Sequence, residues 1–249
     1  MAKITTNMPK LGILLGDSIT QHSFAPHGWG GYLSNQLQRK VDIISRGYSG
    51  YNTRGILHNI EHIFPKNDPQ DTPNNADQNN IAFVTIFLGA NDAALGGNVQ
   101  KNIPGDPQHV PLPEFGENLI KISEYITENL KVDKNRQIII GPPPCDGQAW
   151  LETARIKYQV DIEETNRTFE TTELYSNKSR EIASKLGCRF LDLYENMVTD
   201  GWKDYLSDGL HLSDQGNKFL YEILWEQHVK ELTEDLPQFL PNWRDLPQN

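Results

Sequence analysis

Two apolar runs that end directly in small and polar residues constrain the fold of this chain most. Residues 81–88, Ile-Ala-Phe-Val-Thr-Ile-Phe-Leu, are nearly all apolar and rich in branched and aromatic side chains, which is typical of a central strand covered on both faces. Residues 11–15 form a shorter run, and a buried strand fits it better than so short a helix. Gly-Ala-Asn-Asp follows the first run at 89–92, and Gly-Asp-Ser follows the second at 16–18. In an open α/β sheet such strand ends collect at one edge, where reactive groups gather.

The remaining periodicity alternates strands with helices. Further strands are predicted over residues 41–45, 137–140 and 188–193. Helices are predicted over 113–131, 176–186 and 219–232, and in the second half of 19–38 after an irregular stretch around 26–31. Gly187 is a typical stop after the second of these helices. This alternation indicates an α/β fold with a mostly parallel five-stranded sheet.

Length and composition agree with one domain. The chain has 249 residues, which is within the range of a single α/β domain, and no linker divides it. Residues 65–80 have the composition of a linker, being dominated by Asn, Asp, Gln and Pro, but they lie between two predicted strands. We therefore expect a surface loop there and a single domain over residues 1–249.

The charge of the chain argues against a nucleic-acid partner. Lys and Arg number 23 against 33 Asp and Glu, a formal net charge of -10, and no basic stripe is interleaved with aromatic residues. The N-terminus lacks the charged-then-apolar pattern of a signal peptide, and no apolar run is long enough for a membrane span. We expect a soluble, cytoplasmic protein.

The Cys, His and Gly patterns indicate no metal and no cofactor. Cys145 and Cys188 are the only cysteines, and we expect free thiols because two are too few for a dedicated zinc site. His58 and His62 have the spacing of two metal ligands on a helix, but no third ligand lies nearby in the sequence. Neither of the common glycine-rich nucleotide-binding motifs occurs.

Three short polar segments carry the residue types that serine hydrolysis needs. Ser18 supplies a hydroxyl just beyond a strand end. Asn91 supplies an amide donor where Gly89 removes side-chain bulk, which suits the stabilisation of an oxyanion. Asp208 and His211 lie three residues apart, so in a single turn the carboxylate can hold one imidazole nitrogen while the other faces the serine.

Each segment alone has a simpler interpretation. Gly-Asp-Ser is a common turn, Asn91 fits an Asx-turn, and residues 208–211 fit an exposed loop before a helix cap at Ser213. Gly50 fits either a turn after the strand over 41–45 or a close backbone approach to a substrate oxygen. The segments taken together favour a serine hydrolase.

The content and order of these segments resemble the SGNH (GDSL-type) hydrolase family. The blocks that carry the resemblance are residues 16–20, 47–53, 89–92 and 208–211. Within that family the chain is most similar to the isoamyl acetate-hydrolysing esterases, on residues 110–115, 141–144 and 243–245. Residues 65–80 and 96–109 depart from the family's compact pattern.

The resemblance implies a three-layer α/β/α, flavodoxin-like fold and a catalytic triad. It implies Ser18 as nucleophile, His211 as general base and then acid, and Asp208 as the group that orients the imidazole. It also implies an oxyanion hole made by the backbone N–H groups of Ser18 and Gly50 and by the Asn91 side chain. His211 must remove the serine proton, because a serine hydroxyl is a poor nucleophile at its free pKa.

The resemblance also implies hydrolysis of short-chain, acetate-type esters through an acyl-enzyme, with a small-molecule ester as the partner. Several residues flank the blocks and are candidates for the pocket wall or for ordinary packing: Phe24, Trp29, Leu95, Pro142, Pro143, Pro144, Trp150 and Leu210.

Other hypotheses remain open at this stage. The same triad would serve a thioesterase, a lysophospholipase-like lipase or a carbohydrate deacetylase, and a binding protein could keep the fold without turnover. The tail at 243–245 can pack on the domain or on a second subunit, which leaves a homo-oligomer open.

Overall fold

The computed structural model describes residues 9–65, 80–97, 106–159, 161–240 and 243–245. In this part of the chain five strands form one sheet with parallel neighbours: β1 (Lys10–Gly16), β2 (Val41–Gly47), β3 (Ile81–Phe87), β4 (Gln137–Ile140) and β5 (Arg189–Leu191). Their order across the sheet is β2-β1-β3-β4-β5. The five predicted strands are confirmed, and the sheet is wholly rather than mostly parallel.

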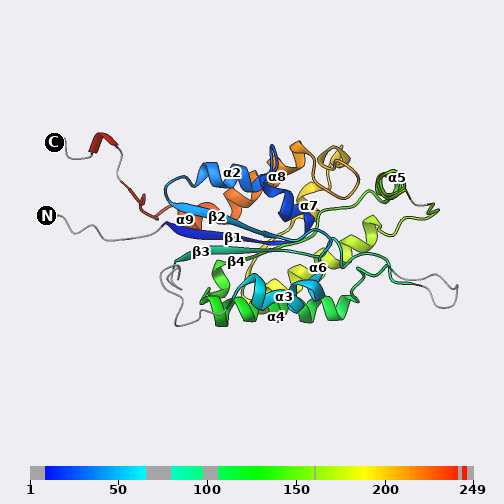
Figure 1. Cartoon of the computed structure of the whole chain (residues 1–249), viewed down its shortest axis with the longest axis horizontal. Helices are drawn as coiled ribbons and strands as arrows, with labels where there is room; N and C mark the ends of the chain where they lie inside the picture. Colours follow the sequence, from blue (N-terminus) through cyan, green and yellow to red (C-terminus); the bar gives the residue numbers. More distant parts are fainter. Residues whose placement is uncertain (1–8, 66–79, 98–105, 160, 241–242, 246–249) are drawn as a thin grey trace.

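Helices cover both faces of this sheet (Figure 1). Above it in that view lie α2 (Trp29–Gln36), α7 (Leu193–Met197), α8 (Asp214–Leu224) and α9 (Lys230–Thr233). Below it lie α3 (Thr53–Ile63), α4 (Leu112–Leu130) and α6 (Phe169–Leu186). Each face has its own apolar core, with Trp29 and Phe83 in the upper one and Phe115 and Ile139 in the lower one. The predicted three-layer α/β/α fold is confirmed.

Polar capping residues begin helices where apolar periodicity gives no signal. The helix predicted over 176–186 begins earlier, at Phe169, because the Thr168 side chain caps it. The helix predicted over 219–232 begins at Asp214, with Ser213 as its cap, and continues through a π-helical turn, Trp225–Val229, into α9. Helices α3 and α5 (Gly147–Tyr158) were not predicted, and Asn52 and Asp146 cap them.

The carboxyl ends of β1, β2 and β3 lie level with one another. Gly16 at the end of β1 lies opposite Gly47 of β2 on one side and Phe87 of β3 on the other. The loops after these three strands therefore leave the sheet together, at the right-hand end in Figure 1. This places three of the sequence blocks at one edge of the sheet.

Close packing at this edge holds the helix that follows β1. This helix, α1 (Ser18–Gln21), begins directly after the strand with Asp17 as its cap, whereas the sequence analysis predicted no helix so early. A Cβ on Gly47 would lie 2.0 Å from Gln21 N and 2.4 Å from the carbonyl carbon of Thr20. Only glycine lets the end of β2 pack so closely against α1.

Two carboxylates are buried beneath the same edge. Burial raises the pKa of Asp92 to about 7, although hydrogen bonds from Thr53 N (3.0 Å) and Thr53 Oγ1 (2.6 Å) favour its ionised form. Burial also raises the pKa of Asp17 to about 6. Because Thr53 is the first residue of α3, the Asp92 side chain attaches this helix to the loop after β3.

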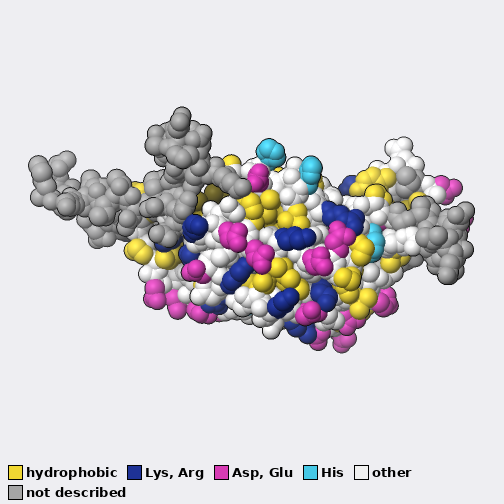
Figure 2. Space-filling model, turned by 90° about the horizontal axis from the view of Figure 1, so that it is seen from below, with side chains coloured by type: hydrophobic (Ala, Val, Ile, Leu, Met, Phe, Trp, Pro, Cys, Tyr) yellow, Lys and Arg dark blue, Asp and Glu magenta, His cyan; other side chains and the backbone are white. Residues whose placement is uncertain are grey.

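The lower face of the molecule carries charges of both signs. Figure 2 shows Lys and Arg side chains interspersed with Asp and Glu, and no single-sign patch covers this face. Within the described ranges, no helix is both long and apolar enough to cross a membrane. Among the same residues, no three His, Cys, Asp or Glu side chains group as metal ligands, and His58 and His62 both lie on α3. Cys145 and Cys188 are free thiols.

Two predicted loops lie partly outside the described residues. Residues 66–79 of the loop predicted over 65–80 lie outside the described residues, as do 98–105 of the segment 96–109. The tail contains a single 3-10 turn, Trp243–Asp245, and the Trp243 side chain is 70% exposed. Packing of this side chain on the domain is therefore not observed, and packing on a second subunit stays a prediction.

Gly47→Ala tests the contact between β2 and α1. The added methyl group would overlap backbone atoms of Thr20 and Gln21, and overpacking of this kind lowers the free energy of unfolding by about 1–3 kcal/mol. The matched control is Gly31→Ala on α2, where an added Cβ meets nothing within 4 Å, and we expect it to stabilise the chain by about 0.5–1 kcal/mol. Urea unfolding measures both, and equal stability of the two variants would contradict the packing argument.

Asp92→Asn tests the effect of the buried carboxylate on stability. Because the pKa of Asp92 is raised in the folded state, its contribution to wild-type stability falls as the pH rises from about 4, where the unfolded chain loses this proton, to about 7. The isosteric amide has no such proton, so the free energy of unfolding of the variant should rise relative to wild type over this range. Urea unfolding across the range measures the difference, with the exposed Asp200→Asn as control. A difference that stays constant with pH would refute the prediction.

Candidate active site

Three side chains from two distant parts of the chain form one series of hydrogen bonds. Ser18, the first residue of α1, has its Oγ 2.9 Å from Nε2 of His211. The other ring nitrogen, Nδ1, lies 2.7 Å from Oδ2 of Asp208. The structure therefore brings together the three residues predicted as a triad, in the order hydroxyl, imidazole, carboxylate.

A tight turn before α8 holds the imidazole. Asp208 Oδ1 accepts hydrogen bonds from the backbone N–H groups of Leu210 (3.0 Å) and His211 (2.7 Å), and Oδ2 is left for the ring. Gly209 has a φ of +88°, and a Cβ there would lie 2.4 Å from Trp150 N. Glycine is required at this position both for the backbone conformation and for the close approach of α5.

The Asp208 carboxylate is ionised at neutral pH. Burial opposes its ionisation, but hydrogen bonds from the ring and backbone of His211 and from the backbone of Leu210 lower the pKa to about 2. An ionised carboxylate at Nδ1 favours the tautomer whose hydrogen lies on Nδ1, which leaves Nε2 free to accept the Ser18 proton. The same negative charge stabilises an imidazolium that forms at this position.

The predicted oxyanion donors lie just after three different strands, at the same edge of the sheet. The buried Asn91 donates from Nδ2 to Tyr51 O at 2.9 Å, and because an amide nitrogen carries two hydrogens, one remains for another acceptor. Gly50 has a φ of +80°, which favours glycine, while a Cβ there would meet only Gln108 Nε2, at 3.5 Å. The Ser18 N–H belongs to the first turn of α1, where helix N–H groups have no partner within the helix.

Arg167 is a residue of this site that the sequence analysis missed. Its side chain is 2% exposed and comes from the segment just before α6. The guanidinium donates to Asn91 Oδ1 at 3.0 Å and to Gln108 Oε1 at 2.6 Å. A single arginine in a polar segment has no periodicity or spacing that would mark it, so only the tertiary structure identifies it.

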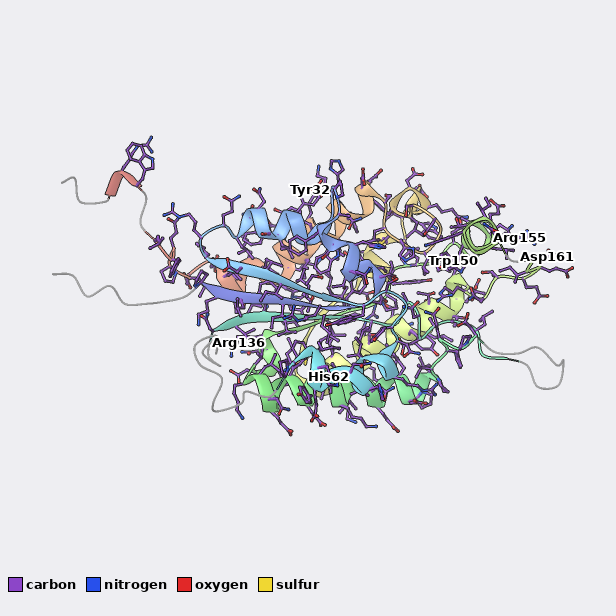
Figure 3. All side chains as sticks on the ribbon, viewed as in Figure 1. Tyr32, His62, Arg136, Trp150, Arg155 and Asp161 are labelled. Carbon is purple, nitrogen blue, oxygen red and sulfur yellow. The ribbon has the colours of Figure 1, made fainter. Side chains whose placement is uncertain are left out.

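Aromatic rings flank the imidazole. The indole of Trp150, from α5, meets the His211 ring edge to face with the ring centroids 6.0 Å apart, and Figure 3 shows Trp150 at the carboxyl end of the sheet. The His22 ring, just after α1, has its centroid 5.9 Å from that of His211. These rings limit the space around the His211 imidazole.

The residues predicted as pocket walls divide between the site and the core. Trp150 contacts the base, as described above. Trp29 instead is fully buried, packs on Phe87 and donates to Ile19 O, so ordinary packing is the correct interpretation for this residue. Phe24 is 46% exposed on the surface.

Comparison with known proteins places the chain in a family. Residues 14–219 match the GDSL-like Lipase/Acylhydrolase family. The isoamyl acetate-hydrolyzing esterase 1 homolog of Homo sapiens is 38% identical over 241 residues, which cover 96% of this chain and 89% of that protein. A GDSL esterase/lipase of Arabidopsis thaliana is 40% identical over 214 residues, covering 84% of this chain and 81% of that protein. The isoamyl acetate-hydrolyzing esterase of Saccharomyces cerevisiae is 30% identical over 254 residues and covers 94% of each.

Solved structures share the fold. An acetylxylan esterase from Geobacillus stearothermophilus superposes with a TM-score of 0.61 at 17% identity, over 96% of this chain and 100% of that chain. A lipase/acylhydrolase from Enterococcus faecalis gives a TM-score of 0.60 at 21% identity, over 92% of this chain and 98% of that chain. At these identities the likeness concerns the fold alone. The match over residues 14–219 and the curated relatives show that the chain belongs to the GDSL-like lipase/acylhydrolase family and is a carboxylic ester hydrolase.

Proposed function

We propose that this chain hydrolyses short-chain, acetate-type esters through an acyl-enzyme, with Ser18 as nucleophile, His211 as base and Asp208 as its orienter. The observation that carries the proposal is the unbroken series of hydrogen bonds from Ser18 Oγ through the imidazole to the carboxylate. The names of the human and yeast relatives favour a small acetate ester as substrate. In this proposal residues 1–249 act as one domain, and no cofactor takes part.

Acylation begins with the ester carbonyl next to Ser18 Oγ. His211 Nε2 removes the hydroxyl proton as Oγ attacks the carbonyl carbon, and the electron pair of the carbonyl moves onto its oxygen. The ionised Asp208 stabilises the imidazolium that results. The new oxyanion accepts hydrogen bonds from the backbone N–H groups of Ser18 and Gly50 and from Asn91 Nδ2, whose stabilising effect is largest in the transition state.

Acylation ends when the alcohol departs. The imidazolium gives its proton to the leaving alkoxide oxygen, the bond between this oxygen and the acyl carbon breaks, and the acyl group stays on Ser18 Oγ. Deacylation repeats these steps with water. A water molecule then loses a proton to His211 Nε2 and attacks the acyl carbon. The collapse of the second tetrahedral intermediate releases the acid, and His211 returns the proton to the serine.

Short acyl groups suit the rigid surroundings of the site. Trp150 is buried against the His211 ring, and Pro142 packs on Gly89, where even an added Cβ would lie 3.1 Å from the proline ring. An apolar pocket separates homologous substrates by about 1–3 kcal/mol per methylene, so each methylene that does not fit should lower kcat/KM by about 10- to 200-fold. A lipase acting on long chains is the second candidate, favoured by the name of the Arabidopsis relative.

A series of p-nitrophenyl esters from acetate to octanoate tests the substrate class. We expect wild-type kcat/KM to fall with chain length, because the Trp150 ring beside the His211 imidazole leaves less room for a longer acyl group. Ser18→Ala should lower kcat by more than about 10⁴-fold on every ester, since no other nucleophile replaces the hydroxyl. The control is Ser184→Ala on the exposed surface of α6, which should keep wild-type activity.

The outcomes of this assay separate the hypotheses. Activity that rises toward octanoate would favour a lipase or a thioesterase pocket, and activity confined to acetylated xylan would favour a carbohydrate deacetylase. A lack of Ser18-dependent turnover on all substrates, together with failure of a phosphonate probe to label Ser18, would favour a binding protein and refute the proposal.

Asn91→Ala tests the oxyanion hole. Loss of one preorganised donor should lower kcat by about 10²–10³-fold, or about 2.7–4 kcal/mol of transition-state stabilisation, with a smaller change in KM. Steady-state kinetics on p-nitrophenyl acetate measure both constants. Asn129→Ala on α4 is the matched control, because Asn129 Nδ2 donates to Tyr125 O of its own helix and not to any described residue of the site. Near-normal kcat in the Asn91 variant would count against the assignment.

A further inference from the structure

We propose that Arg167 is a positioning residue that orients two of the three oxyanion donors at once. The inference rests on the proposed function, because it assigns a role in the same oxyanion hole. It starts from the burial of the side chain, which is 2% exposed. Among the described residues, no other Lys or Arg is buried. A buried guanidinium loses its hydration, and this loss lowers its pKa and must be offset by hydrogen bonds.

The hydrogen bonds of Arg167 go to the loop that carries Asn91. Its Nε donates to Ala90 O at 3.3 Å, and its Nη2 donates to Asn91 Oδ1 at 3.0 Å. The guanidinium carbon lies 5.4 Å from the centre of the Trp150 ring, the same ring that packs on the catalytic imidazole. The guanidinium therefore contacts both the Trp150 ring and the loop that carries Asn91.

The contact with Asn91 decides which way its amide faces. A guanidinium only donates hydrogen bonds, so it pairs with the oxygen of the amide and never with its nitrogen. With Oδ1 held by Arg167, Nδ2 lies on the opposite side, where one hydrogen goes to Tyr51 O. The second hydrogen is thereby available to a substrate oxyanion. Without Arg167, only the hydrogen bond to Tyr51 O would hold this orientation, and an amide that reversed would present its oxygen to the oxyanion and repel it.

A second set of hydrogen bonds, the arm to Gly50, runs from Arg167 through Gln108 to the Gly50 carbonyl. Arg167 Nη2 donates to Gln108 Oε1 at 2.6 Å, and Gln108 Nε2 donates to Gly50 O at 2.8 Å. The first contact orients the glutamine amide by the same reasoning, so that its nitrogen faces the glycine carbonyl. Gly50 has a φ of +80° and is free to adopt other conformations, so a bond to its carbonyl restricts the residue whose N–H is the proposed donor.

The test is a double-variant cycle at Arg167 and Asn91, with Ser18 titrated by a phosphonate so that kcat refers to folded sites only. Arg167→Gln should lower kcat by about 10- to 100-fold, the effect of losing a charge-assisted hydrogen bond, with KM changed much less. Arg167→Lys keeps one donor and should recover part of this loss. The double variant Asn91→Ala/Arg167→Gln should lose less activity than the product of the two single effects, because without Asn91 only Gly50 is left for Arg167 to orient.

The matched control is Arg136→Gln at the opposite end of the sheet (Figure 3). Arg136 Nη1 donates to Ile81 O at 2.6 Å, so its loss should lower stability but leave kcat per titrated site unchanged. If Arg167→Gln does not fold, Gln108→Ala provides the second variant, since Gln108 is only partly buried. It cuts the arm to Gly50 and should lower kcat with KM changed much less.

Each outcome distinguishes this inference from the proposed function. Multiplicative effects of Arg167→Gln and Asn91→Ala in the double variant would overturn the positioning role while leaving the oxyanion role of Asn91 intact. A Gln108→Ala variant with wild-type kcat would overturn the arm to Gly50. A wild-type kcat in Asn91→Ala itself would overturn the proposed oxyanion hole, and the inference with it.

Discussion

The level ends of three parallel strands are the constraint on which the rest of this molecule depends. Because Gly16 lies opposite both Gly47 and Phe87, the loops after β1, β2 and β3 leave the sheet at one height. The Ser18, Gly50 and Asn91 segments follow these ends, and the turn that carries His211 needs only to reach the same edge. The absence of a side chain at Gly47 keeps α1 against β2, so the hydroxyl of Ser18 has a fixed place.

Burial of polar groups beneath this edge is the second feature of the site. Asp17, Asp92 and Arg167 lie within a few residues of the proposed catalytic groups or in contact with them, and each is almost fully buried. Burial raises the pKa of both carboxylates and lowers that of the guanidinium, so the ionised forms are disfavoured at all three positions. Their hydrogen bonds go to the start of α1, to the start of α3 and to the loop after β3, and so join these segments at the edge of the sheet.

The sequence predicted most reliably what depends on local pattern. Strands covered on both faces are continuous apolar runs, and for this reason β1 and β3 are evident from residues 11–15 and 81–88. Helix starts were predicted poorly, since the first turns of α6 and α8 are mostly polar and their caps, Thr168 and Ser213, each accept one hydrogen bond from the helix backbone. The residues of the proposed triad were found through their motifs, whereas Arg167 and Gln108 have no motif.

Local patterns in the sequence were enough to predict the five strands, several of the helices between them, and the residue types able to carry out ester hydrolysis, because each of these is encoded within a few neighbouring residues. Which groups meet depends instead on the tertiary structure. Ser18 Oγ and His211 Nε2 lie 2.9 Å apart, although the two residues are 193 positions apart in the chain. Arg167 donates a hydrogen bond to Asn91, which is 76 positions away. Contacts of such sequence separation follow from the register of the sheet and the packing of the layers, and no local pattern of residues specifies them.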